Sequence, residues 1–294
     1  MKTSDLTELF VLAALWGSSF LFMRIAAPEF GPFALVELRV GLAALFLVPL
    51  LAWHGGLKTL WRRAGVLLLV GLINSALPFV LYAWALLSIP AGFAAITNAT
   101  APLFAALIAW LWLKDRLSAT AVIGLLIGLC GVVILVWPKI DFGADAPGWA
   151  VLACLAATLS YGVAASVTKR HLTGVAPLAI AAGSQLYAAL LVAPLAWWHW
   201  PQHNPGVEPW LAAGVLALGC TGIAYILFFR LIASVGPARA IAVTFLIPAF
   251  GMLWGVLFLD ESVTTSMIAG AAVILLGVGL ANGIVRLPGK VAPD

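Results

Sequence analysis

The sequence predicts an all-α integral membrane protein of ten transmembrane helices, arranged as two inverted five-helix repeats. Three observations predict this class: an apolar composition, ten apolar runs of helical length, and an internal duplication at half the chain length. Of the 294 residues, 64% are hydrophobic and 9% are charged, whereas a soluble domain carries about 25% charged residues. This is too little charge to cover a water-facing surface, so we expect most of the chain to lie in lipid.

The ten apolar runs each approach the length of about 20 residues that a spanning helix needs. The connections between them are short and rich in Gly and Pro, which leaves no room for a soluble domain. We therefore expect the functional residues to lie among the helices. The expected spans are Leu6–Met23, Phe33–Trp53, Gly65–Leu86, Ala91–Leu113, Ala119–Val136, Gly148–Val167, Leu178–Trp198, Trp210–Ala233, Ala238–Leu259 and Ser266–Val285.

The two halves of the chain carry matching residues at a nearly constant spacing. An offset of 145 or 146 positions relates the following pairs: Trp16 and Tyr161, Gly17 and Gly162, Ser88 and Ser234, Pro102 and Pro248, Asp115 and Glu261, Gly124 and Gly270. The expected repeats are residues 1–137 and 138–294. Because five spans are an odd number, the second repeat crosses the membrane in the opposite sense, which defines an inverted-topology repeat.

The distribution of Lys and Arg predicts the orientation, since cytoplasmic loops carry more of them. With a cytoplasmic N-terminus, the outer side holds Arg24, Arg39 and Lys139. The inner side then holds Lys2, Lys58, Arg62, Arg63, Lys114, Arg116, Lys169, Arg170, Arg230, Arg239, Arg286 and Lys290. We therefore expect both termini in the cytoplasm and the protein in the inner (plasma) membrane. The net charge of +4 is attributed to loops facing the anionic leaflet, and no nucleic-acid partner is expected.

Polar and helix-breaking residues within spans are costly in lipid unless they face protein or water. They occur here at helical spacing and at corresponding places in both halves, which favours a central cavity that binds a small molecule. The alternative is that Ser, Thr and Asn only join helices and that Pro only bends them. The expected substrate-binding residues are Trp16, Ser19, Asn74, Tyr82, Asn98, Tyr161, Thr221, Tyr225 and Thr244, and the expected gating kinks are Pro78, Pro102 and Pro248.

Glu37 and Arg39 form the charged pair placed inside an expected span. Two residues apart on a helix, they point to different faces and do not pair with each other. Arg39 is a candidate to attract a substrate carboxylate, and Glu37 to pair with Arg24 or carry a proton. The alternative is an interhelical ion pair that fixes the outer end of the bundle.

The fifth and tenth spans are glycine-rich and nearly free of polar residues. Glycines at this spacing are typical of close helix packing. They are Gly124, Gly128 and Gly131 in one span, and Gly270, Gly277, Gly279 and Gly283 in the other. Such spans suit a scaffold or a homodimer face better than a substrate path.

The four histidines show no metal-ligand spacing, and no phosphate-binding loop or catalytic pair is present. We expect no cofactor, no metal and no enzymatic activity.

Several motifs resemble the EamA family of the drug/metabolite transporter superfamily. They are Trp16-Gly-Ser-Ser-Phe20, Arg39 after Pro32, Ala91–Leu117 with Asn98 and Pro102, and the stretch from Gly236 through Pro248 to Glu261. The resemblance covers nearly the whole chain and is greatest to the YddG-type amino-acid exporters. It implies ten helices in two inverted repeats, a central cavity between the halves, peripheral fifth and tenth helices, and export of amino acids or other small metabolites. The family usually has Glu-Arg where this chain has Asp115-Arg116.

The function that these observations predict is transport of small metabolites, foremost amino acids, by alternating access. Efflux of drugs or aromatic compounds is the alternative within transport, although most of the 13 tryptophans fall at span ends, where interfacial belts explain them. An intramembrane enzyme would need acidic or His clusters at membrane depth, and a non-transporting scaffold would not need the polar set within the spans.

Overall fold

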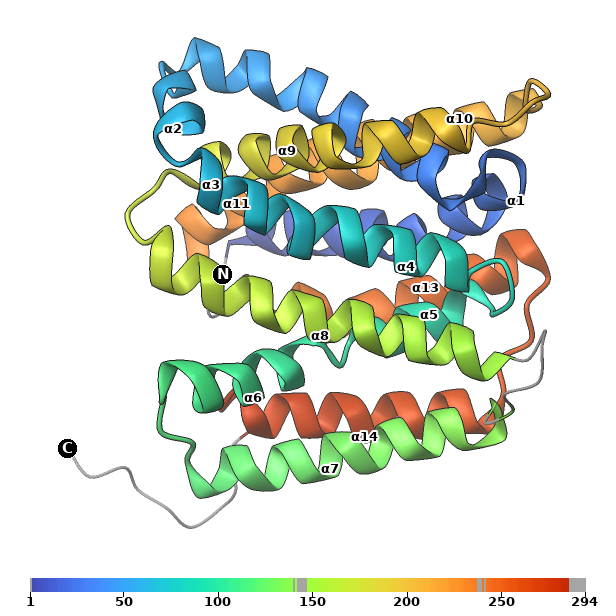
Figure 1. Cartoon of the computed structure of the whole chain (residues 1–294). Coiled ribbons are helices and arrows are strands. Elements are labelled where there is room, and N and C mark those ends of the chain that lie inside the picture. The colour runs from blue at the N-terminus through green and yellow to red at the C-terminus, as the bar shows by residue number, and fades with distance from the viewer. Residues whose placement is uncertain (1, 140, 142–146, 237–239, 241, 286–294) are drawn as a thin grey trace.

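The computed structural model describes residues 2–139, 141, 147–236, 240 and 242–285. Within these ranges the chain is helical and contains no strand, and its helices run side by side along one direction (Figure 1). Of the residues used to predict orientation and repeats, Arg239, Arg286 and Lys290 lie outside the described ranges. The helices of eight or more residues are α1 (Thr3–Trp53), α3 (Ala64–Gly71), α4 (Leu77–Ala85), α5 (Ala91–Asn98), α6 (Ala101–Leu113), α7 (Ala119–Val136), α8 (Pro147–His171), α9 (Pro177–Trp198), α10 (Val207–Ala217), α11 (Ala224–Val235), α13 (Val243–Leu259) and α14 (Thr265–Ala281).

Seven helical stretches of the described chain are long and apolar enough to cross a membrane. Two further apolar helices, α13 and α14, have 17 residues each. Short elements join or interrupt the stretches: α2 (Leu57–Arg62), the π-helical turns η1 (Leu72–Ala76) and η3 (Leu218–Ile223), and the 3₁₀ turn η2 (Trp137–Lys139). The all-helical membrane architecture predicted from the sequence is therefore confirmed for the described residues.

Helix α1 is 51 residues long, which at 1.5 Å per residue is about two and a half times the thickness of a bilayer core. It is not straight: Gly31 has φ 72° and ψ 162°, outside the helical region and accessible mainly to glycine. Pro32 follows and disfavours a helical conformation at the preceding residue. The chain therefore folds back at Gly31, and Figure 1 shows the two halves of α1 running in opposite directions.

Two turns have the same backbone geometry although they lie 146 residues apart. Lys114 ends α6 and Asp260 ends α13, with φ of 57° and 52°. In each case the next N–H reaches back over the last helical turn: Asp115 N donates to Ala109 O at 3.2 Å, and Glu261 N to Gly255 O at 3.1 Å. Left-handed residues of this kind are common helix terminators.

The helices that follow these turns also begin alike. The Ser118 hydroxyl accepts a hydrogen bond from Ala121 N at 3.1 Å at the start of α7. The Thr264 hydroxyl accepts one from Met267 N at 3.3 Å at the start of α14. Both are standard N-caps. The helical stretches Ala64–Ala85 and Val207–Val235 match as well, since each contains a π-helical turn, beginning at Leu72 in one and at Leu218 in the other.

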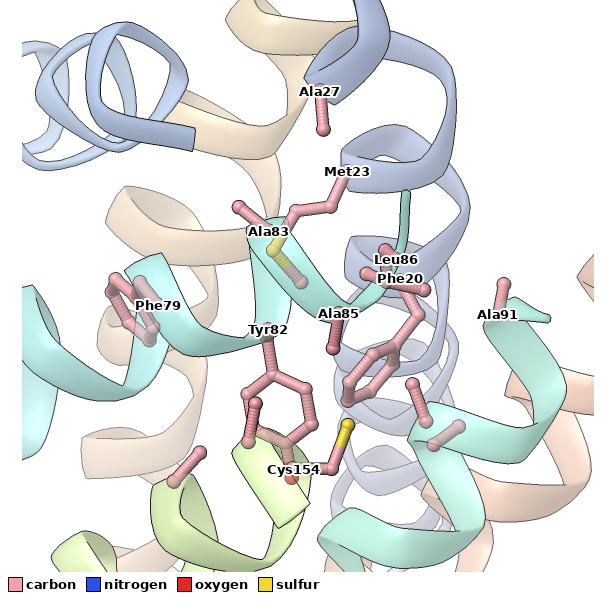
Figure 2. Packing of buried hydrophobic residues seen from close by; sticks show 14 of the residues in the cluster. Phe20, Met23, Ala27, Phe79, Tyr82, Ala83, Ala85, Leu86, Ala91 and Cys154 are labelled. Atoms are coloured by element: carbon pink, nitrogen blue, oxygen red, sulfur yellow. The ribbon is translucent and has the colours of Figure 1, made fainter. Parts of the chain in front are cut away.

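The largest buried cluster extends across most of the bundle and includes many residues of α1, α4, α5 and α8. Figure 2 shows Met23 between Ala27 and Ala83, and Phe20 beside Tyr82, whose ring points toward Cys154 of α8. The Phe20 and Tyr82 rings meet edge to face with centroids 5.4 Å apart, a favourable aromatic geometry. Large aromatic side chains thus fill the space on one side of the bundle centre.

Helices α7 and α14 pack together along one edge of the bundle (Figure 1). Their glycines form the contact: a side chain at Gly131 would lie 2.6 Å from Ile274 N, and one at Gly277 would meet the backbone of Gly128. Small residues allow such backbone approach. A homodimer through these helices stays a prediction, and its interface would have to use faces other than these packed glycines.

Replacing Gly131 with Val should therefore destabilise the protein. The new Cβ would lie within 3.0 Å of Ile274 and Val273 atoms, two of them backbone, and overpacking of this kind costs about 1–3 kcal/mol. We expect the thermal unfolding midpoint in detergent to fall by roughly 3–10 °C. Gly214→Val is the matched control, because no atom lies within 4 Å of a Cβ at Gly214; an equal loss in both variants would contradict the packing argument.

Candidate functional site

A cavity of about 350 Å³ lies at the centre of the bundle. The structure brings to it all nine residues predicted to bind substrate, together with Arg39 and Pro102. Pro78, Pro248 and Glu37 do not line it. The remaining lining residues are Phe20, Met23, Phe79, Ala101, Ala105, Ala165, Cys220, Phe228 and Ile247.

The sequence analysis did not single out most of these further residues, because apolar side chains in apolar helices carry no distinct signal. Phe20 is four residues after Trp16, and Phe228 is three after Tyr225. Helical spacing from a predicted cavity residue would therefore have identified both.

Helices α1 and α8 each present an aromatic residue to the cavity and a glycine to a neighbouring helix. Trp16 and Tyr161 line the cavity. A Cβ at Gly17 would lie 2.6 Å from Phe250 Cβ in α13, and one at Gly162 would lie 2.8 Å from Phe104 C in α6. The glycine lets the two helices touch and thereby fixes the aromatic residue beside it.

Both π-helical turns supply cavity residues and use their irregular backbone to hold neighbouring groups. In η1, Asn74 lines the cavity, while Ile73 O accepts a hydrogen bond from the Ser160 hydroxyl of α8 at 2.6 Å. In η3, the Thr221 hydroxyl donates to Leu216 O at 2.9 Å. Single π turns are frequent at functional sites.

Aromatic rings form much of the cavity wall. Trp16 and Phe228 have centroids 5.1 Å apart, and Tyr82 stacks on Tyr161 at 6.4 Å. The Tyr82 hydroxyl lies 3.4 Å from Asn98 Oδ1, a long hydrogen bond that leaves the amide group accessible to another partner. The wall thus offers apolar faces with a few neutral hydrogen-bonding groups.

Arg39 lies at the cavity with 6% of its surface exposed. Glu37 does not line the cavity, which agrees with its predicted position on a different helix face from Arg39. Its Oε2 is buried and has no hydrogen-bond partner among the described residues. Arg24 does not pair with Glu37; its guanidinium donates to Leu86 O instead. In the described part of the chain, neither Glu37 nor Arg39 forms the interhelical ion pair that was considered as the alternative.

The prolines occupy different settings. Pro102 follows a break at Ala99 and Thr100 that separates α5 from α6, whereas Pro248 lies inside continuous α13. Pro78 is buried near the start of α4, directly after η1. All three lie beside irregular or weakened backbone, because proline removes one helical hydrogen bond.

A second cavity of about 250 Å³ adjoins the first and shares Asn74, Tyr161, Ala165 and Tyr225 with it. Its other lining residues include Val70, Thr168 and Ile180. These lie toward the bundle end that carries Arg63, Lys169 and the C-terminus of α11. Together the two cavities extend from the bundle centre toward this basic end.

The family model of the EamA-like transporter family matches the chain twice, over residues 7–137 and 148–283. The chain therefore belongs to the EamA-like transporter family, and it is a multi-pass membrane transporter. This membership confirms the resemblance in the sequence motifs. The closer resemblance to YddG-type exporters stays a prediction.

Three relatives align over most of their length. The uncharacterized transporter YvbV of Bacillus subtilis is 25% identical over 96% of this chain and 92% of its own. The uncharacterized inner membrane transporter YedA of Escherichia coli is 28% identical over 84% and 80%. A probable terminal-alkyne amino-acid exporter of Streptantibioticus cattleyicolor is 25% identical over 96% and 95%.

A solved crystal structure has the same fold. Its TM-score is 0.67 at 23% sequence identity, with 97% of this chain and 98% of that chain covered. The relatives above are all named as transporters, in accord with the absence of a catalytic motif from the sequence.

The close contact at Gly162 should control the shape of the cavity. In Gly162→Val, the added side chain would push α8 away from α6, because the nearest atoms are backbone C and N of Phe104 and Ala105 at 2.8 and 2.9 Å. We expect N-ethylmaleimide to modify the cavity thiol Cys220 several-fold faster, measured in a Cys130→Ser, Cys154→Ser background. Gly65→Val serves as control, since a Cβ there meets nothing within 4 Å; unchanged labelling in Gly162→Val would refute the role of this contact.

Proposed function

We propose that the protein exports small, partly apolar amino acids or related metabolites through the central cavity. The observation that carries this proposal is the gathering of aromatic faces and neutral hydrogen-bonding groups around about 350 Å³, a volume within the range of small-molecule sites. The relative named as a probable amino-acid exporter, aligned over 96% of this chain, supports the substrate class.

We further propose ten spans in two inverted repeats, residues 1–137 and 138–294. The fold at Gly31 makes two spans of α1, six further long stretches supply six, and α13 and α14 supply two. The matched turns at Lys114 and Asp260 support the repeat. The excess of Lys and Arg at one end supports cytoplasmic termini, and the inner membrane relative of Escherichia coli supports the inner membrane as location.

Transport in this proposal proceeds by alternating access, with the described conformation closed at the outer end. There, the Glu261 carboxylate accepts hydrogen bonds from Ala91 N at 2.6 Å and Gly92 N at 3.1 Å. This contact joins the end of α13 to the start of α5, and the favourable field of a helix N-terminus strengthens it. The second cavity, which extends toward the basic end, supports an inward-facing conformation.

Efflux of aromatic compounds is the second candidate function. The observation that favours it is the aromatic wall formed by Trp16, Phe20, Tyr82, Tyr161 and Phe228. Such rings bind apolar bodies with little selectivity. The polar groups among them, Asn74 and Asn98 in particular, favour a substrate with hydrogen-bonding groups over a purely lipophilic one.

Uptake of radiolabelled amino acids into proteoliposomes, with and without an imposed proton gradient, tests the main proposal. We expect saturable uptake of some of them and at least a tenfold lower rate for Asn98→Ala or Tyr82→Phe, because each removes a hydrogen-bonding group from the cavity wall. Asn282→Ala is the control, since that amide bonds Val278 O at the end of α14. No amino-acid uptake, with efflux of aromatic dyes intact, would replace the main proposal with the second candidate.

Weakening the outer contact should favour the outward-open form. In Glu261→Gln, loss of the negative charge weakens the bonds to Ala91 N and Gly92 N, and caps of this kind contribute about 0.5–2 kcal/mol. We expect a membrane-impermeant thiol reagent applied from outside to label Cys220 severalfold faster, in the Cys130→Ser, Cys154→Ser background. Glu208→Gln, on the exposed start of α10, should leave labelling unchanged; slower outside labelling in Glu261→Gln would contradict the assignment of this contact to the outer gate.

A further inference from the structure

The guanidinium of Arg39 is surrounded by neutral groups. Its Nε donates to the Thr221 hydroxyl at 3.1 Å, and its Nη1 lies 3.5 Å from the Met23 sulfur. Its Cζ lies over the face of the Phe79 ring, 3.5 Å from the ring centroid. A hydroxyl, a thioether and an aromatic face orient the group without neutralising its charge.

No acidic side chain is among the described residues that line the cavity, and Arg39 is their one charged member. The nearest acid on the same helix, Glu37, lies outside this lining and close to Gly41, from whose Cβ position its Oε1 is 3.4 Å away. Arginine keeps its proton inside proteins, and a buried charge without an opposite charge is costly. The described lining of the cavity therefore carries one positive charge and no negative charge to balance it.

A guanidinium has five N–H donors, and the contacts with Thr221 and Met23 use two of them. The planar arrangement of these donors matches the two oxygens of a carboxylate. The Thr221 hydroxyl, itself fixed by its bond to Leu216 O, and the Phe79 ring hold this plane in place before any ligand arrives. The group is thus oriented in advance for an anion.

The amino group of a free amino acid finds no such partner. An ammonium would add a second positive charge to a cavity whose described lining contains no carboxylate, and repulsion between charges is strong where water is excluded. Acylation removes this charge and leaves an amide, and the side-chain amides of Asn74 and Asn98, which line the same cavity, can hydrogen-bond it. The aromatic wall then receives the apolar side chain.

We propose that Arg39 binds the substrate carboxylate and that the transported species is a net anion: an N-acylated apolar amino acid, or a monocarboxylate of the same shape. This inference rests on the proposed function of the central cavity as the substrate site. It makes Arg39 the residue that determines substrate charge, and Thr221 a positioning residue for its guanidinium.

Competition for transport in proteoliposomes tests the proposal with three ligands that share the phenylalanine side chain, two of which also match in size. N-acetyl-L-phenylalanine is an anion, L-phenylalanine is a zwitterion, and N-acetyl-L-phenylalanine amide is neutral. With the wild-type protein we expect the anion to be taken up or to compete at least tenfold more effectively than the neutral amide, and more effectively than the zwitterion. This comparison needs no variant and is independent of any folding defect.

Variants then assign the preference to one residue. Arg39→Gln should remove the preference for the anion over the neutral amide, whereas Arg39→Lys should retain part of it. Arg62→Gln, at the exposed end of α2, should keep it entirely. A tenfold preference that survives in Arg39→Gln would overturn the role of Arg39.

The outcomes also separate this inference from the proposed function. Uptake of free amino acids that depends on Asn98 but shows no preference for the anion overturns the inference and leaves the proposed function standing. Uptake of none of the three ligands or of any amino acid overturns both.

Discussion

Every backbone polar group in the hydrocarbon region has to find a partner within the protein, and this constraint organises the structure. Regular helices satisfy it automatically. Where the helices are irregular, other groups complete the bonding. The Ser160 hydroxyl donates to Ile73 O in the π-helical turn η1, and the Thr100 hydroxyl donates to Thr97 O beside the break between α5 and α6. Irregular backbone of this kind is tolerated in membranes where protein or a cavity covers it.

These irregularities lie next to the residues that line the cavity. Asn74 and Thr221 belong to the two π-helical turns, and Asn98 is the last residue of α5, before the break that separates α5 from α6. The same interruptions that cost regular hydrogen bonds therefore give the bundle its polar groups at membrane depth. A set of unbroken apolar helices would pack well but would offer a small molecule little to bind.

The sequence predicted the helical membrane class and the set of polar cavity residues because both leave a local signal. Trp16, Asn74 and Tyr82 stood out as polar or aromatic positions at helical spacing, repeated in the second half of the chain. The contribution of Phe79 was not predictable, since its role comes from the Arg39 guanidinium that lies against it. Such contacts depend on which helices pack together, and neither residue of the pair indicates its partner in the sequence.

The contact of Glu261 with the start of α5 was not predictable from the sequence either. Glu261 and Ala91 are 170 residues apart, and neither residue alone signals the other. The duplication marked Glu261 as the counterpart of Asp115, but the two carboxylates have different partners: Asp115 pairs with Lys169 at 2.6 Å on the surface. One copy of a repeated motif is therefore engaged with a helix start while the other is engaged with a lysine, an asymmetry that a sequence comparison of the halves does not reveal.

The glycine contact between α7 and α14 has a mechanical consequence. These helices belong to the two proposed repeats and touch backbone to backbone, so the repeats are tied together along one edge of the bundle. A rotation of one repeat against the other then has its smallest displacement at this edge and its largest at the opposite side, where α9 packs on α1. In the proposed alternating-access cycle, the α7–α14 pair is then the axis about which the cavity changes the side to which it opens.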